Sequence, residues 1–105
     1  MSKKEAKIDN PLIIELRKPI KFEDETIKEI DLTGLENLKT KDLIELEKQF
    51  NLDGNFSSQP EASVAYARLV SNKVTDLPLE FFDQLGARNI IKVKTAVMNF
   101  FYGEE

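Results

Sequence analysis

The stretch Leu12-Ile-Ile-Glu-Leu-Arg17, close to the N-terminus, decides the fold. Apolar and more polar side chains alternate along it, which is typical of a half-buried β-strand. The apolar side chains of this strand are Leu12, Ile14 and Leu16. A second β-rich stretch covers residues 26–32, and the acidic residues 23–25 between the two predict a turn without an Asn-Gly or Asp-Gly signal. We therefore expect a β-hairpin over about residues 12–32.

Helical spacing replaces strand alternation after Thr33-Gly34. Thr40 is a good N-cap for a helix over about residues 41–51. The four residues Ser58-Gln-Pro-Glu61 match a capping box with proline in the first turn, which predicts the start of a second helix. The apolar stripes of these helices are Leu43, Leu46 and Phe50, and Ala62, Ala65, Tyr66, Leu69 and Val70.

Two further helices are expected toward the C-terminus. A short one follows Asp76-Leu-Pro78 and ends at Gly86, which we expect to be a left-handed cap. The last begins at Ala87 or Asn89 and runs to about Tyr102.

These elements together predict an α+β fold, in which an N-terminal β-hairpin packs on a small bundle of three to four α-helices. We expect a single domain over residues 12–102 and a short C-terminal tail over residues 103–105. Residues 1–11 are expected to form a flexible N-terminal arm, because nothing in them could bury a face.

Composition restricts the chemistry that the chain can perform. Its 105 residues are 41% hydrophobic and 32% charged, enough for one domain with its own core. The sequence has no cysteine and no histidine, which excludes disulfides, thiolate metal sites and the commonest general base. Its four glycines are scattered, so there is no glycine-rich phosphate loop. We expect a protein that is not an enzyme, with no catalytic residues, cofactor or metal.

Particular stretches of the sequence argue against a calcium site, against nucleic-acid binding and against a membrane span. The segment Asn51–Asn55 is rich in side-chain oxygens, but Ala62 stands where an EF-hand needs its bidentate glutamate, so an inter-helix loop is the favoured interpretation. The net charge of −4 and the acidic neighbours of the scattered basic residues argue against nucleic acid. The first apolar stretch stops at Glu15, too early for a signal peptide or a membrane span, so we expect a cytoplasmic protein. The scattered basic residues are Lys39, Lys41, Lys48, Arg88, Lys92 and Lys94.

An excess of large apolar residues between Leu77 and Tyr102 is the main anomaly of the sequence. Two interpretations stay open. Either the last two helices are buried nearly all round, or they expose an apolar patch for a partner or an oligomer. The candidate partner-binding residues are Ile91, Met98, Phe101 and Tyr102. A second route to oligomers is the edge of the first strand, which no feature of the sequence except Pro19 protects.

Several short motifs resemble a known family. Leu16-Arg-Lys-Pro-Ile-Lys-Phe22 is followed by Ile30-Asp-Leu-Thr-Gly-Leu35 and by Asp42-Leu-Ile-Glu-Leu-Glu47, and the C-terminal part runs from Leu77-Pro78 to Val97-Met-Asn-Phe-Phe101. This pattern is similar to that of the small tail assembly chaperones of long-tailed bacteriophages, of the P2-like and Mu-like group. The resemblance covers about residues 12–102. Asn89 stands where that family is expected to have aspartate.

The resemblance implies a role rather than a reaction. Such chaperones bind the tape measure protein in the cytoplasm of the infected host, keep it soluble while tail tube protein polymerises around it, and are absent from the mature virion. A longer form made by ribosomal frameshifting often accompanies the short one, and would be a further partner. Two alternatives stay open: a small structural tail or head-completion component that is retained in the virion, and a small cytosolic adaptor.

Overall fold

The computed structural model describes residues 10–103. The element order is β1 (Ile13–Phe22), β2 (Glu25–Asp31), η1 (Thr33–Asn37), α2 (Thr40–Leu52), η2 (Pro60–Ala62), α3 (Val64–Val74), α4 (Leu79–Asp83) and α5 (Ala87–Tyr102). The predicted α+β fold, a β-hairpin followed by a helical bundle, is confirmed. Most of the predicted N-terminal arm, residues 1–9, and the end of the predicted tail lie outside the described residues.

The hairpin is antiparallel and buries the side of β1 that alternation predicts. Ile14 lies opposite Ile30, and both are buried. The register is irregular between Glu15 and Ile20, where Pro19 cannot donate to the ladder. The strand nevertheless continues beyond this point to its end at the turn.

The hairpin turn consists of two residues, Glu23 and Asp24. Their φ angles are 48° and 69°, both in the left-handed region. Positive φ at both central positions is the property of a type I′ turn, whose twist matches that of the flanking strands. The sequence lacks the Asn-Gly pair that adopts this conformation most readily, so local sequence alone does not define the turn type.

Three predicted helix caps are wrong, although the helices exist. Thr40 is the first residue of α2, whose N-cap is Lys39 with its backbone N–H donating to Asp42 Oδ2 at 2.9 Å. The motif at Ser58 leads into the 3₁₀ turn η2, and α3 begins only after Ser63, whose Oγ accepts from Tyr66 N at 3.1 Å. Gly86 has a φ of −65° and is the N-cap of α5 rather than a left-handed end of α4.

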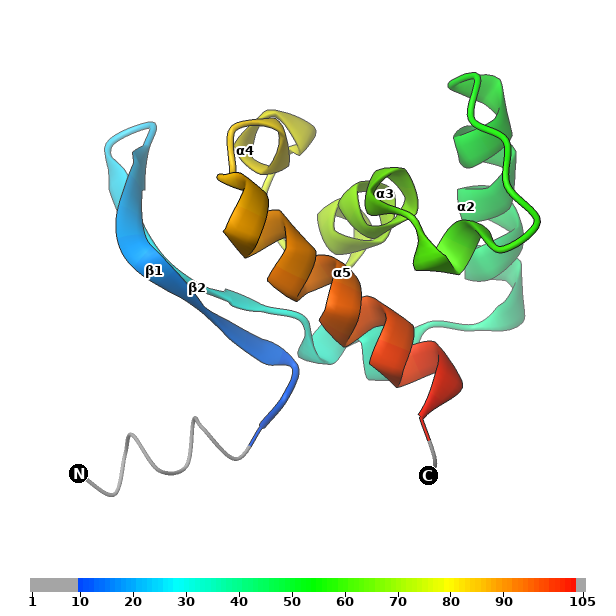
Figure 1. Cartoon of the computed structure of the whole chain (residues 1–105), viewed down its shortest axis with the longest axis horizontal. Helices are drawn as coiled ribbons and strands as arrows, with labels where there is room; N and C mark the ends of the chain where they lie inside the picture. Colours follow the sequence, from blue (N-terminus) through cyan, green and yellow to red (C-terminus); the bar gives the residue numbers. More distant parts are fainter. Residues whose placement is uncertain (1–9, 104–105) are drawn as a thin grey trace.

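Helix α5 lies at the centre of the molecule, with the hairpin on one side and α3 and α2 on the other (Figure 1). A single hydrophobic core receives side chains from the hairpin, from η1 and from all four α-helices of the described chain. The buried side chains of α5 are Val93, Ala96 and Val97. Because α5 contacts both β1 and α3, it joins the hairpin to the bundle.

Candidate partner-binding surface

The outer face of α5 carries three of the four residues that the sequence suggests for partner binding. Ile91, Met98 and Tyr102 are seven and four residues apart, a spacing that places them on one side of a helix. Ile91 is 45% exposed and Tyr102 is 51% exposed, whereas Met98 is half-buried. The structure therefore brings these three residues together on the side of α5 opposite its buried side chains.

Phe101, the fourth predicted residue, is turned toward α3. Its ring lies 6.4 Å from that of Tyr66, which in turn packs edge-on against Phe50 at 5.9 Å. Its other aromatic neighbour is Phe100, at 5.3 Å. Phe101 is half-buried and packs against the hydrophobic core. Replacing it would therefore alter folding as well as any surface contact.

The C-terminal end of the α5 face is tied to η2. The Tyr102 hydroxyl donates a hydrogen bond to Glu61 Oε2, and this bond raises the pKa of the tyrosine above its ordinary value. Tyr66 nearby has its pKa raised to about 12, chiefly because burial disfavours the phenolate, and Glu47 and Glu61 add to the effect. Both tyrosines are therefore neutral at physiological pH.

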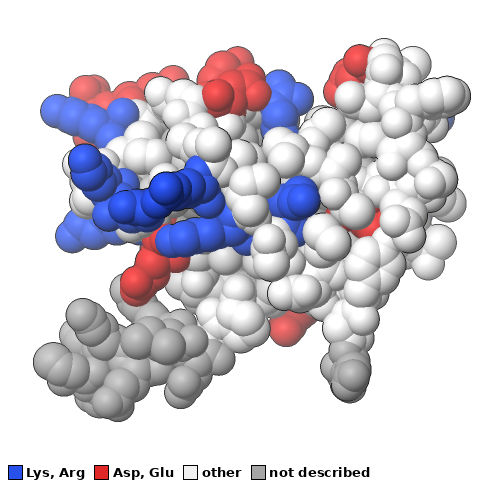
Figure 2. All heavy atoms as spheres, viewed as in Figure 1, with Lys and Arg blue, Asp and Glu red and all other residues white. Residues whose placement is uncertain are grey.

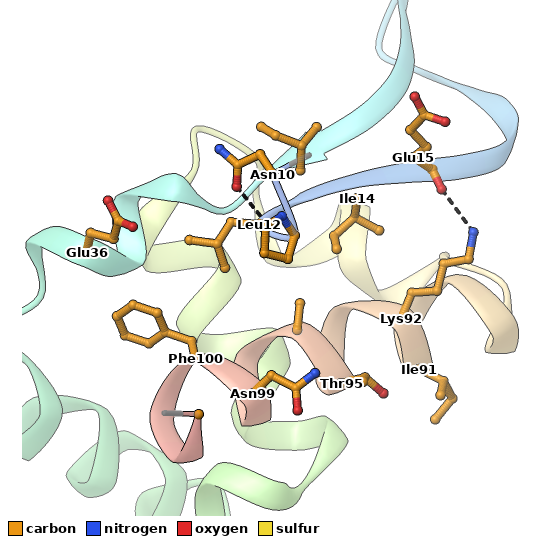
Figure 3. Close-up of a pocket in the computed structure, with 14 residues that line it drawn as sticks. Asn10, Leu12, Ile14, Glu15, Glu36, Ile91, Lys92, Thr95, Asn99 and Phe100 are labelled. Carbon is orange, nitrogen blue, oxygen red and sulfur yellow. Dashed lines mark hydrogen bonds between the residues drawn. The ribbon is translucent and has the colours of Figure 1, made fainter. Parts of the chain in front are cut away.

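A groove of about 800 Å³ runs between the start of β1 and α5 (Figure 3). Its walls are mixed: Leu12, Ile14 and Phe100 contribute apolar surface, and Thr95 and Asn99 contribute polar groups from α5. The further lining residues that Figure 3 labels are Asn10, Glu15, Glu36, Ile91 and Lys92. The groove thus runs along α5 from Ile91 to Phe100, and Ile91 is the predicted partner residue that also lines it.

The edge of β1 that does not pair with β2 is partly covered by α5. Lys92 Nζ donates to the backbone oxygen of Glu15 at 3.1 Å, as Figure 3 shows. Asn89 Oδ1 accepts from the backbone N–H of Arg17 at 3.4 Å. The expectation that only Pro19 protects this edge is therefore wrong, because two side chains far away in sequence also cap it.

Sequence reasoning missed a second set of exposed apolar side chains, on α2 and the loop after it. Ile44 is 58% exposed, Leu52 is 75% exposed and Phe56 is 95% exposed. Ile44 and Leu52 lie off the buried stripe that contains Leu46 and Phe50. That offset was visible in the helical spacing, but the exposure of Phe56 was not, because loop side chains have no periodicity.

The oxygen-rich segment that begins at Asn51 lies at the C-terminal end of α2, where its side chains bond to neighbouring groups of that helix. Asp53 Oδ1 accepts from Gln49 Nε2 at 2.8 Å, and Asn55 Nδ2 donates to the Phe50 carbonyl at 3.2 Å. Gly54, with a φ of 90°, turns the chain between them. Within residues 10–103, no three acidic side chains are grouped as a metal site would need. None of the helices described is both long and apolar enough to cross a membrane.

Comparisons with protein-family models, curated proteins and solved structures found no match for this chain.

Proposed function

We propose that this protein is a non-enzymatic tail assembly chaperone, which binds the tape measure protein of a phage or prophage in the host cytoplasm and keeps it soluble. The motifs between Leu16 and Phe101 support the proposal through their resemblance to that family. The binding surface we propose is the outer face of α5, formed by Ile91, Met98 and Tyr102 together with the edge of Phe101.

The observation that carries the proposal is the exposure of large apolar side chains on α5, whose opposite side already packs into the hydrophobic core. Ile91 and Tyr102 keep about half of their surface in water, although burial of such side chains is favourable by about 25 cal/mol per Å². Met98 between them is an adaptable side chain of the kind used on surfaces that accept varied partners. A surface of this type suits a client that must be held without being chemically changed.

The test is co-expression with the tape measure protein encoded in the same phage or prophage, followed by a pull-down from the soluble fraction. The site variant is Ile91→Ser with Tyr102→Ser, since both side chains are exposed. Removal of α5 is unsuitable, because Val93 and Val97 are completely buried and the domain would unfold. The matched control is Ile44→Ser with Leu52→Ser, which removes two exposed apolar side chains from α2 instead.

We expect the wild type and the α2 control to keep the tape measure protein soluble, and the α5 variant to lose at least about 90% of the complex, as truncation of central interface residues does. Circular dichroism checks that both variants retain their helix content. Loss of the complex in the α2 control alone would move the site to α2. An absence of binding by the wild type, with the chain present in purified tails, would instead favour a structural tail component.

A further inference from the structure

Basic side chains gather where the hairpin meets the start of α5 (Figure 2). We call this the basic surface and define it by three exposed residues that the contacts between β1 and α5 bring together: Arg17 of β1, and Arg88 and Lys92 of α5. The hydrogen bonds from Arg17 to Asn89 and from Lys92 to Glu15 hold the two elements side by side. The fold therefore collects positive charge on one side of a chain whose net charge is −4.

The cations of the basic surface form no ion pair with a carboxylate among residues 10–103. The ion pairs of this part of the chain lie elsewhere, between Arg68 and Asp83 and between Lys73 and its two acidic neighbours on α2. Helix α5 contains no acidic residue at all. Lys92 Nζ donates to a backbone oxygen instead. Such a surface attracts anionic partners, and its field also repels the approach of basic ones.

An apolar contact lies inside this charged area. Ile91, 45% exposed, has Lys92 next to it in sequence and Arg88 three residues before it, on the adjacent turn of α5. Ile91 and Lys92 also line the groove between β1 and α5. A partner that fills this area must therefore bring apolar side chains as well as negative charge.

We infer that the basic surface binds an acidic amphipathic segment of the partner, with carboxylates over Arg17, Arg88 and Lys92 and an apolar side chain against Ile91. The inference rests on the proposed function, in which the outer face of α5 holds a client, and it specifies the chemistry of the client segment at one end of that face. The other end, at Tyr102, takes the more apolar part of the client.

A peptide fits this surface better than a nucleic acid does. Single-stranded nucleic acids bind on aromatic side chains that stack with bases. The exposed aromatic residues among those described are Phe56 and Tyr102, and neither belongs to the basic surface. The apolar contact at Ile91 and the overall negative charge also disfavour a polyphosphate backbone. An acidic amphipathic segment brings glutamate or aspartate to the cations and an apolar side chain to Ile91.

The experiment uses two double variants with equal net charge. Arg17→Glu with Arg88→Glu reverses two cations of the basic surface whose side chains make no hydrogen bond within the described chain, and glutamate near the start of α5 suits the helix dipole. Lys41→Glu with Lys48→Glu is the matched control on α2, where neither lysine is ion-paired among the described residues. Binding is measured by fluorescence anisotropy with a labelled helical peptide of glutamate, alanine and leucine. A peptide with glutamine for every glutamate and a single-stranded oligonucleotide are also measured.

We expect the wild type and the α2 control to bind the acidic peptide alike, and the basic-surface variant to bind it at least about tenfold more weakly. The glutamine peptide should bind no better than the variant does, and added salt should weaken the wild-type complex. Equal binding of the acidic peptide by both double variants, or no binding by the wild type, overturns the inference. Tighter binding of the oligonucleotide than of the peptide also overturns it.

The same variants in the co-expression assay separate this inference from the proposed function. Loss of the tape measure complex in the basic-surface variant alone supports both. A complex that is equally soluble with both double variants leaves the proposed function standing and overturns the inference. A wild type that holds no tape measure protein contradicts the proposed function, and the peptide measurement then decides the inference by itself.

Discussion

Gly34 lies where η1 passes the end of α3, and the two segments approach each other closely. A Cβ at this position would lie 2.8 Å from the backbone oxygen of Val74 and 3.1 Å from its Cβ. The first distance is shorter than van der Waals contact allows, and it involves backbone that cannot rotate away. The reason for glycine here is thus a close approach between distant segments rather than the local conformation of the turn.

We expect Gly34→Ala to destabilise the protein by about 1–3 kcal/mol, the usual cost of an overpacked contact. Urea unfolding followed by circular dichroism measures the change. Gly86→Ser is the control, because a Cβ at Gly86 meets no atom within 4 Å and serine is a preferred N-cap for α5. A Gly34 variant as stable as the wild type would show that η1 and α3 can separate without cost.

At the scale of one element, the start of α3 separates a sequence motif from the cap that forms. Ser58 and Glu61 have the spacing of a capping box, yet Pro60 begins a 3₁₀ turn that ends at Ala62. The chain then extends for one residue at Ser63, whose Oγ accepts from Tyr66 N. The serine that caps α3 is therefore Ser63, and not Ser58 of the predicted capping box.

Replacement of Ser63 by alanine is predicted to cost about 1 kcal/mol of stability, the typical value for loss of an N-cap side chain. Ser58→Ala removes a hydroxyl of the same size from an exposed residue and should change the stability by less than about 0.5 kcal/mol. Thermal and urea unfolding of the two variants in parallel give the comparison. A larger loss of stability with Ser58→Ala than with Ser63→Ala would show that Ser58 caps the helix, as the sequence motif suggests.

The sequence was sufficient to predict the existence and type of each main element, because alternation and helical spacing are local properties. Buried Ile14 and Ile30 in the hairpin, and Val93 and Val97 in α5, follow these periods directly. The helix caps were harder to predict, because several residues near Gly86 could end or begin a helix with similar local energies. Contacts with neighbouring elements decide between such alternatives, and a local sequence pattern does not predict where those elements lie.

At the scale of the whole molecule, α5 protects the exposed edge of the two-stranded sheet. Asn89 and Lys92 use side chains to occupy the backbone groups of Arg17 and Glu15 that would otherwise be open to another strand. An unprotected edge is a template for pairing with a second chain. The sequence could not predict this protection, since the residues involved are separated by 72 and 77 positions.

The double variant Asn89→Ala with Lys92→Met should self-associate through β1 as its concentration rises, and should lose about 1 kcal/mol of stability for each hydrogen bond removed. Sedimentation velocity over a range of concentrations detects the association. Lys48→Met with Asn51→Ala, two exposed positions on α2, is the control with matched chemistry. Association by the control to the same extent would mean that added hydrophobicity, not the strand edge, is responsible.

The candidate surface could be anticipated only in part from the sequence. Helical spacing places Ile91, Met98 and Tyr102 on one face, so their proximity was predictable. The burial of Phe101 against Tyr66 was not, because it depends on how α3 crosses α5. The basic surface could not be predicted for a similar reason, since it combines Arg17 of β1 with Arg88 of α5, which only the fold brings together.

The contacts between β1 and α5 also govern when the protein can fold during synthesis. A two-stranded hairpin is at best marginally stable alone. In this chain the edge of β1 is held by a helix translated about seventy residues later, and Phe22 packs against Phe81 of α4. Until α4 and α5 have been translated, the nascent hairpin lacks both of these contacts. The combined surface of β1 and α5 therefore forms only after α5 has left the exit tunnel, so the binding that we propose there cannot begin before that moment.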